Sequence, residues 1–173
     1  NEFIKHRLEN LTPKFHHRVL EIVQDLDSTP TISIAVEPLQ KMIDGLIKNA
    51  VENTPDHGKI KVMVSKQESG ARLVVEDYGI GIIADHQQRI FEGFFTTQET
   101  SGYSSKKLFD FNAGGRGADL LRMKIFSEQY NFSIDVTSNR CKFIPGKNDI
   151  CPGNIDDCTF CSDKNDCYQS GGS

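Results

Sequence analysis

A glycine-containing turn at residues 77–82 narrows the possible folds of this chain more than any other segment. The turn reads Asp-Tyr-Gly-Ile-Gly-Ile and directly follows residues 72–76, which have the apolar pattern of a buried strand. Asp77 therefore stands at a strand end, with its carboxylate beside whatever the turn borders. Gly79 and Gly81 permit backbone angles that other residues avoid, and they allow a ligand to approach the chain closely.

Asp77 has two interpretations. A carboxylate only accepts hydrogen bonds, so it suits an exocyclic amine such as that of adenine. Alternatively, Asp77 closes an Asx turn by accepting a hydrogen bond from its own backbone. A short Asp-x-Gly-x-Gly pattern occurs in many loops, so this segment alone leaves both interpretations open.

An amphipathic helix is predicted over residues 38–54. Pro38 suits the first helical turn, and apolar residues recur at helical spacing at positions 39, 42, 43, 46, 47 and 50. Asn49 lies at the edge of this apolar stripe, and Asn53 follows one turn later. The side-chain oxygen of Asn49 could bind a Mg²⁺ ion that also holds phosphates. The alternative is an ordinary asparagine at the boundary between buried and exposed surface.

With two later blocks, these segments resemble the catalytic and ATP-binding domain of sensor histidine kinases. The later blocks are the Phe-rich residues 91–97 and a second glycine cluster at 114–117. In order, the four blocks are similar to the N box, first glycine box, F box and second glycine box of that family. The resemblance covers about residues 15–140. It implies an α+β fold, a two-layer α/β sandwich of the Bergerat type, whose mixed and mostly antiparallel sheet is covered by helices on one face.

The resemblance also implies a role for each block. Asn49 would bind Mg²⁺, Asp77 would bind the adenine amine, and residues 96–114 would form a lid over ATP. The further nucleotide-binding residues that it implies are Asn53, Gly79, Gly81, Ile82, Phe91, Thr96, Thr97, Gly115, Arg116 and Gly117. The domain would transfer the γ-phosphate of ATP to a histidine on a separate dimerisation domain, as a protein histidine kinase that acts with a response regulator. Catalysis would rest on positioning and charge neutralisation, without a catalytic side chain of its own.

Three residues depart from the family pattern. Gly45 stands where ATP-hydrolysing relatives such as gyrase and Hsp90 carry a glutamate base, which argues against an ATPase of that kind. Glu52 replaces a lysine that kinases often have near the phosphates, and Asp119 replaces a third glycine. The alternative function is therefore a degenerate nucleotide-binding regulatory module with a cluster of cysteines that senses a metal or the redox state.

All five cysteines lie after residue 140, and the last four have the spacing C-x6-C-x2-C-x5-C. The residues between them are mostly Pro, Gly, Asn and Asp, which are typical of loops and bury little. We expect a structural Zn²⁺ site formed by Cys151, Cys158, Cys161 and Cys167, with Cys141 as the alternative ligand. An iron–sulfur cluster also fits the count. The remaining alternatives are one or two disulfides plus a spare thiol, or unpaired loop cysteines.

The length of 173 residues suits one α/β domain. Residues 1–14 are expected to be a linker or the end of a helix from an upstream domain, and residues 15–140 the ATP-binding domain. Residues 141–173 are expected to be a cysteine-rich insertion in a final hairpin whose last strand is missing. Further strands are expected at 19–26, 31–36 and 132–137, and a helix at 117–130.

Charge and hydropathy exclude some partners. A net charge of −4 offers no basic surface for nucleic acid, and no apolar run is long enough to cross a membrane. We therefore expect a cytoplasmic fragment without nucleic-acid or membrane contacts, in a parent protein that could itself be membrane-anchored. None of the five histidines has the sequence context of a phosphoacceptor, so the acceptor is expected outside this chain.

Overall fold

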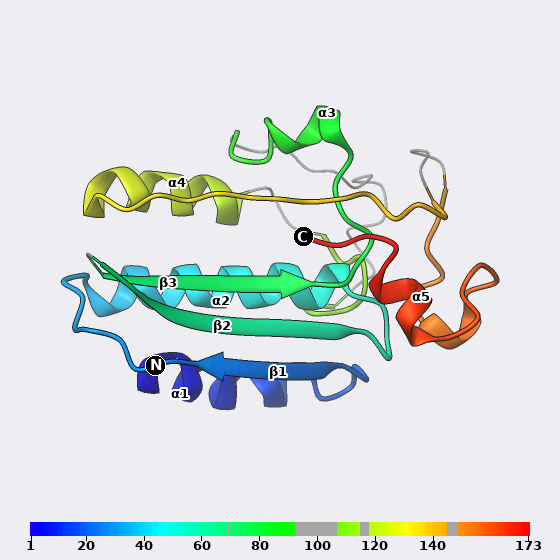
Figure 1. Ribbon diagram of the computed structural model, residues 1–173, viewed down its shortest axis with the longest axis horizontal. Coiled ribbons are helices and arrows are strands. Elements are labelled where there is room, and N and C mark those ends of the chain that lie inside the picture. Colours follow the sequence, from blue (N-terminus) through cyan, green and yellow to red (C-terminus); the bar gives the residue numbers. More distant parts are fainter. Residues whose placement is uncertain (69, 93–106, 115–117, 145–148) are drawn as a thin grey trace.

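A computed structural model describes residues 1–68, 70–92, 107–114, 118–144 and 149–173, and it shows helices packed against a small sheet (Figure 1). In chain order, the elements are α1 Glu2–Leu11, η1 Thr12–Phe15, β1 Glu21–Leu26, α2 Val36–Asn53, β2 Lys59–Gln67, β3 Gly70–Asp77, α3 Ala84–Gln87, α4 Ala118–Tyr130, η3 Ile155–Asp157 and α5 Lys164–Tyr168. None of the described helices has the length and apolar content needed to span a bilayer.

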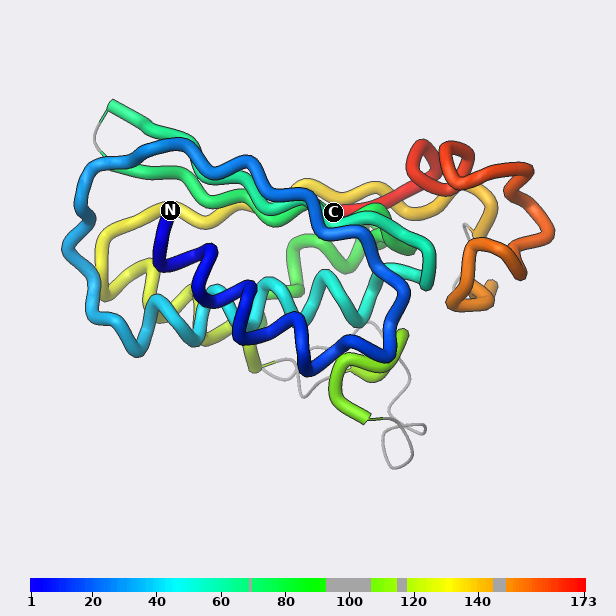
Figure 2. The backbone as a smooth tube through the Cα atoms, turned by 90° about the horizontal axis from the view of Figure 1, so that it is seen from below, coloured from blue at the N-terminus to red at the C-terminus, as the bar shows by residue number. Residues whose placement is uncertain are grey.

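The sheet is mixed and has the strand order β1-β2-β3. β1 pairs with β2 in parallel, and β2 pairs with β3 in an antiparallel ladder that brings Ile60 opposite Asp77. Helices α1, α2 and α4 lie on the same side of the strands (Figure 2). Residues along β2 alternate between buried and partly exposed, as expected for a strand with one covered face. The predicted two-layer α+β architecture is confirmed.

The hydrophobic core lies between the helices and β2. α2 contributes Ile43, Ile47 and Val51, which are almost completely buried. α1 contributes three more buried side chains, and each such burial stabilises by about 1.5–3 kcal/mol. The N-terminal segment thus forms the helix α1, which packs in the same core. The division of the chain into three segments stays a prediction.

Two of the expected strands do not form. Residues 31–36 are mostly exposed, have no strand partner among the described residues, and lead into α2 at Val36. Residues 132–137 run beside β3 without joining its ladder (Figure 1). Both segments alternate apolar and polar residues, but a strand also requires a neighbour that pairs with its backbone groups. That requirement is not visible in the local pattern.

The chain end enters the space between β3 and the segment 131–140. Ser173 exchanges two backbone hydrogen bonds with Asp77, of 2.8 and 3.1 Å, on one side of this space. On the other side, Gly172 exchanges two with Asn139, of 2.9 and 3.0 Å, in an antiparallel bridge. Asn139 and Gly172 therefore bracket the cysteine-rich segment, and the two ends of that segment meet beside the 77–82 turn.

Candidate functional site

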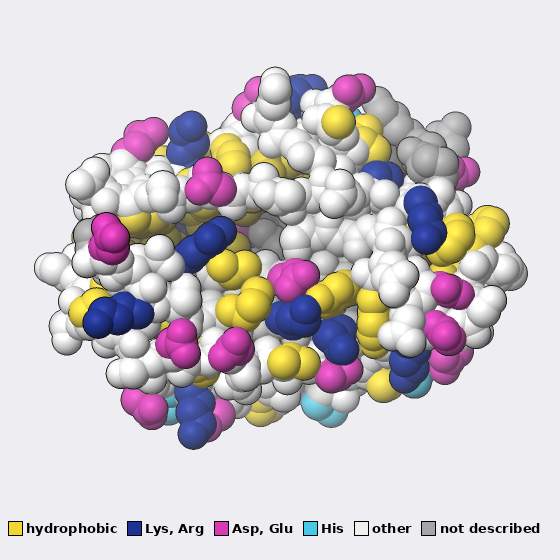
Figure 3. Space-filling view, in the orientation of Figure 1, with side chains coloured by type: hydrophobic (Ala, Val, Ile, Leu, Met, Phe, Trp, Pro, Cys, Tyr) yellow, Lys and Arg dark blue, Asp and Glu magenta, His cyan; other side chains and the backbone are white. Residues whose placement is uncertain are grey.

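A broad groove opens between α2, α4, the 77–82 turn and the segment 131–140, and the face seen in Figure 3 is hollowed there. We call it the central groove. Five of the predicted nucleotide-binding residues line it, two on α2 and three at or after the end of β3: Asn49, Asn53, Asp77, Gly81 and Ile82. The fold therefore brings together residues that are up to 33 positions apart in sequence.

Asp77 closes an Asx turn at the end of β3. Its Oδ1 accepts a hydrogen bond of 3.0 Å from the backbone N–H of Gly79, while Oδ2 has none from any residue that the structure describes. Burial raises the pKa of the Asp77 carboxyl to about 7, because the Gly79 bond only partly offsets the loss of water and Glu76 adds a like charge. The Asx turn leaves Oδ2 for a ligand donor, so the two interpretations of Asp77 are compatible.

The two glycines of the turn fit against the chain's own backbone. A Cβ on Gly79 would lie 2.1 Å from the carbonyl oxygen of Asn53, and a Cβ on Gly81 would lie 1.8 Å from that of Asn139. Gly81 also has φ of +63°, which favours glycine. Gly81 lines the central groove, whereas Gly79 lines a different cavity, described below. Both residues therefore allow the turn to pack closely between α2 and residue 139.

Asn49 and Asn53 lie one helical turn apart at the end of α2. The side-chain amide of Asn53 donates to the Asn49 carbonyl at 2.8 Å, and the Asn53 carbonyl accepts from Ile80 N–H at 3.4 Å. These bonds fix the end of α2 against the turn. In the part of the chain that the structure describes, no group of three or more His, Cys, Asp or Glu side chains is placed to hold a metal ion. A Mg²⁺ ion here would therefore depend on the Asn49 amide oxygen and on phosphate oxygens of a ligand.

Lys48 neutralises both acids that depart from the family pattern. Its Nζ lies 3.1 Å from Asp119 Oδ2 and 3.9 Å from Glu52 Oε2. Glu52 is almost fully buried, which raises its pKa despite the nearby Lys48, and its Oε1 accepts from Phe109 N–H at 3.2 Å. The side chain of Glu52 thus holds the 107–114 segment. It is not an unpaired charge directed at a phosphate.

Arg18 is a buried residue whose role the sequence did not indicate. Its guanidinium donates to the carbonyls of Val51 and Thr54 at the end of α2, at 3.0 and 2.7 Å, and to that of Phe109 at 2.9 Å. It also pairs with Asp56 at 2.8 Å. A cation at a helix C-terminus satisfies carbonyls that have no partner within the helix. Arg18 therefore joins the end of α2 to the 107–114 segment.

The described end of the expected lid is packed into the core. Phe109 is only 4% exposed, and its ring centroid lies 5.6 Å from that of Phe15. The backbone N–H of Asn112 donates to the Glu52 carbonyl at 2.6 Å. Residues 107–114 are therefore packed against the core in this structure, at the end of the segment that was expected to form the lid.

The remaining predicted residues are placed differently or not described. Phe91 is half-buried after α3 and does not line the central groove. Gly45 lies where α2 meets α4, and a Cβ there would approach the Met123 side chain to 2.8 Å. The other predicted residues lie outside the described part of the chain: Thr96, Thr97, Gly115, Arg116 and Gly117.

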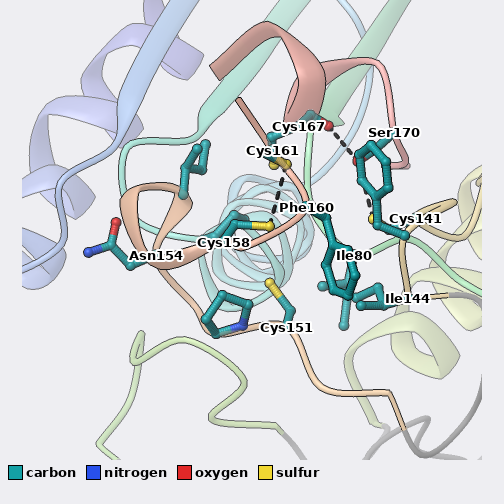
Figure 4. Close-up of a pocket in the computed structure, with 15 residues that line it drawn as sticks. Ile80, Cys141, Ile144, Cys151, Asn154, Cys158, Phe160, Cys161, Cys167 and Ser170 are labelled. Carbon is teal, nitrogen blue, oxygen red and sulfur yellow. Dashed lines mark hydrogen bonds between the residues drawn. The ribbon is translucent and has the colours of Figure 1, made fainter. Parts of the chain in front are cut away.

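All five cysteines surround one small cavity of about 20 Å³ behind the 77–82 turn (Figure 4). We call it the thiol cavity. Its walls are Cys141, Cys151, Cys158, Cys161 and Cys167, together with Pro55, Gly79, Ile80, Phe143, Ile144, Pro152, Asn154, Ile155, Phe160 and Ser170. The sulfurs of Cys158 and Cys161 lie 3.4 Å apart, and Cys141 Sγ lies 3.2 Å from Ser170 Oγ. The structure has all five thiols free.

Burial and mutual proximity make three of the thiols hard to ionise. Loss of water and the neighbouring thiols raise the pKa of Cys161 to about 12 and that of Cys167 to about 11. Burial likewise raises the pKa of Cys151. Cys151, Cys161 and Cys167 are therefore neutral thiols at physiological pH.

The sequence profile of the family described as histidine kinase-, DNA gyrase B- and HSP90-like ATPases matches residues 35–149. The matched region contains α2, the 77–82 turn and α4, which are the elements that line the central groove. The chain belongs to this family.

The individual proteins that resemble this chain include several sensor kinases. The phosphate regulon sensor protein PhoR of Pseudomonas aeruginosa is 27% identical over 146 residues, and the match spans 83% of this chain but 29% of PhoR. A mycobacterial sensor histidine kinase, MprB, has the same fold, with a TM-score of 0.59 and 21% identity over 75% of this chain and 76% of that one. Full-length ShkA in complex with AMPPNP gives a TM-score of 0.58 and 26% identity over 73% of this chain and 24% of that one.

Proposed function

We propose that this chain is the ATP-binding catalytic domain of a two-component sensor histidine kinase. It would present the γ-phosphate of ATP to a histidine on a separate dimerisation domain of the same protein. One observation carries the proposal: Asp77 stands at the wall of the central groove with a carboxylate oxygen available to accept the adenine amine. A family relationship to kinases and the complex of ShkA with AMPPNP, an ATP analogue, support the same ligand.

The triphosphate would extend from the 77–82 turn toward Asn49. There an amide oxygen and the phosphates would share Mg²⁺, which supplies charge neutralisation during phosphoryl transfer. Pairing of Glu52 and Asp119 with Lys48 lowers the repulsion that those two acids would otherwise exert on the phosphates. Asn53, Gly81 and Ile82 would complete the base side of the site, as their positions in the central groove support.

Titration with Mg-ATP and a phosphotransfer assay test this function together. The 173-residue chain should bind Mg-ATP, and Asp77→Asn should weaken that binding by about 1.5–3 kcal/mol because a charged acceptor is lost. The protein that contains this chain should transfer ³²P from γ-labelled ATP to an acid-labile, base-stable phosphohistidine. Equal affinity of parent and variant would refute the assignment of Asp77. Absence of labelled histidine, with ATP binding intact, would refute the kinase.

We also propose the partners and setting that a kinase of this class requires. These are a dimerisation domain that carries the acceptor histidine, a response regulator that receives the phosphoryl group, and a cytoplasmic location where ATP is available. Sensor kinases among the relatives support them.

We further propose that the thiol cavity binds one Zn²⁺ ion, through Cys151, Cys158, Cys161 and Cys167, with Cys141 as the alternative ligand. Two thiolates on a tetrahedral zinc lie about 3.8 Å apart, close to the 3.4 Å between Cys158 and Cys161. Thiolates on a four-iron cluster bind different irons and lie farther apart, so the close pair favours a single ion over a four-iron cluster. A cavity of about 20 Å³ also suits a single ion. Since the sulfurs do not yet form a ligand shell, zinc would draw them inward.

Elemental analysis of the purified chain tests the zinc site. We expect about one zinc per chain in the parent and its loss in the double variant Cys158→Ser/Cys161→Ser. The alternative function, a regulatory module that no longer binds nucleotide, predicts zinc without ATP binding.

A further inference from the structure

The thiol cavity and the central groove share a wall. Gly79 and Ile80, in the middle of the 77–82 turn, line the thiol cavity, and Ile80 also lines the central groove. Gly79 N–H is the donor that holds the Asp77 carboxylate. A change in the shape of the thiol cavity therefore reaches the proposed adenine acceptor through two successive residues.

Both ends of the cysteine-rich segment bind the turn. On entry to the segment, Cys141 N–H donates to the Ile80 carbonyl at 2.9 Å, and Arg140 Nη1 donates to that of Gly81 at 3.4 Å. At its exit, Ser173 pairs with Asp77. Cys141 and Ser170 also link these two ends through the 3.2 Å contact between their side chains. Of the residues that hold the turn, Cys141 also lines the thiol cavity.

The middle of the segment binds the loop after α2. Gly153 and Ile155 form a short parallel pairing with Asp56, with bonds of 2.8 and 3.1 Å. Tyr168 Oη donates to the His57 carbonyl at 3.1 Å. The cysteine-rich segment therefore contacts the 77–82 turn and the loop that follows α2, the helix that carries Asn49 and Asn53.

Among the residues of this segment that the structure describes, few apolar side chains are buried. Ile144 and Ile155 are buried, but Ile150 is 84% exposed and Phe160 is 56% exposed. A segment with so little apolar burial depends on a cross-link for its order, so metal binding there becomes folding energy. Closure of the thiols around an ion would tighten the walls of the thiol cavity, including Gly79 and Ile80.

We propose that zinc binding in the thiol cavity and nucleotide binding in the central groove are thermodynamically linked through the 77–82 turn, so that the cysteine cluster regulates the kinase. This inference rests on the proposed ATP-binding function and the proposed zinc site. Since zinc tightens the wall that holds the Asp77 carboxylate, zinc should raise the affinity for nucleotide. Because linkage is reciprocal, nucleotide should raise the affinity for zinc by the same factor.

The first test measures the affinity of the 173-residue chain for Mg-ATP with zinc bound, and again after zinc removal by a chelator under reducing conditions. We expect the affinity to fall at least about fivefold on zinc removal. Equal affinity in the two states, in a chain that binds zinc, would overturn the linkage. A chain that binds no zinc would overturn it as well.

A matched pair of variants tests whether the linkage passes through Ile80. Ile80→Ala alters the shared wall, whereas Ile82→Ala alters the same turn at a residue that lines only the central groove. Both can change the affinity for Mg-ATP, but only Ile80→Ala should reduce the ratio of affinities with and without zinc. The same loss of ratio in both variants, or in neither, would contradict transmission through the shared wall.

Hydrogen exchange separates failure of the linkage from failure of the proposed function. Zinc should slow amide exchange at residues 79–81 in the parent chain and in Asp77→Asn, which keeps the thiol cavity intact. If the chain bound no ATP but zinc still protected these amides, the function would fail while the structural connection held. Unchanged exchange at 79–81 would refute the connection itself.

Discussion

Binding of an adenine nucleotide is expected to release a proton from Asp77. Burial holds the pKa of this carboxyl at about 7 in the free chain. An amine that donates to Oδ2 stabilises the ionised form, so the pKa falls when the nucleotide binds. A change of pH across the pKa of Asp77 in the free chain should therefore change both the number of protons released on binding and the affinity for the nucleotide.

The magnitude follows from this pKa. If binding lowers the pKa by two units or more, about 0.8 protons per nucleotide leave at about pH 6 and about 0.1 at about pH 8. Over that interval the nucleotide affinity should rise about tenfold, because the free protein no longer has to lose a proton first. Isothermal titration calorimetry in buffers of different ionisation enthalpy measures the released proton directly.

Asp77→Asn is the control, because the difference in proton release between the parent and this variant belongs to Asp77. The reasoning fails if the parent and Asp77→Asn release the same number of protons at about pH 6.

The free energy of unfolding should change with pH in the direction opposite to the nucleotide affinity. The pKa of Asp77 is raised from 3.8 to about 7, so its penalty is absent below the unfolded value and develops as the pH rises through this window. Asp77→Asn should therefore raise the melting temperature at about pH 8 while it weakens nucleotide binding.

Three further substitutions probe the site. Asn49→Ala should abolish the Mg²⁺ dependence of nucleotide affinity, measured with and without EDTA; an unchanged dependence would exclude Asn49 as a ligand. Arg18→Gln should lower the unfolding free energy in urea by about 2–4 kcal/mol, whereas the exposed control Arg122→Gln should change it by less than about 0.5 kcal/mol. Gly81→Ala should destabilise by at least about 2 kcal/mol, since its Cβ would meet the Asn139 carbonyl at positive φ; a smaller loss would show that residue 139 can move away.

The parts of the fold that could be predicted from sequence are those with a local cause. The helix over 38–54 was predicted from its apolar spacing and is found as Val36–Asn53. Ile60 and Val62 alternate with Lys59 and Lys61, and this stretch forms the strand β2. Residues 31–36 and 132–137 carry a similar alternation but pair with no strand in the described chain. Pairing depends on a neighbour that is distant in sequence, so the local pattern overestimated the sheet.

The site residues also divide into those with a signal in the local sequence and those without one. Asp77 and Asn49 could be predicted because their types and spacing are read directly from the sequence. The role of Arg18 could not, because three of its acceptors are backbone carbonyls, which carry no side-chain signal. The glycines of the turn were assigned to the approach of a ligand, whereas the structure presses them against backbone carbonyls of residues 53 and 139. Convergence of the cysteines around one cavity agrees with their spacing, while the ion they bind stays a prediction.

The unpaired edge of β3 has a practical consequence for handling the protein. On the side away from β2, its backbone groups pair with no described residue except at Asp77, where Ser173 approaches. An exposed strand edge is a template for another strand, so concentrated samples of this chain are prone to edge-to-edge association.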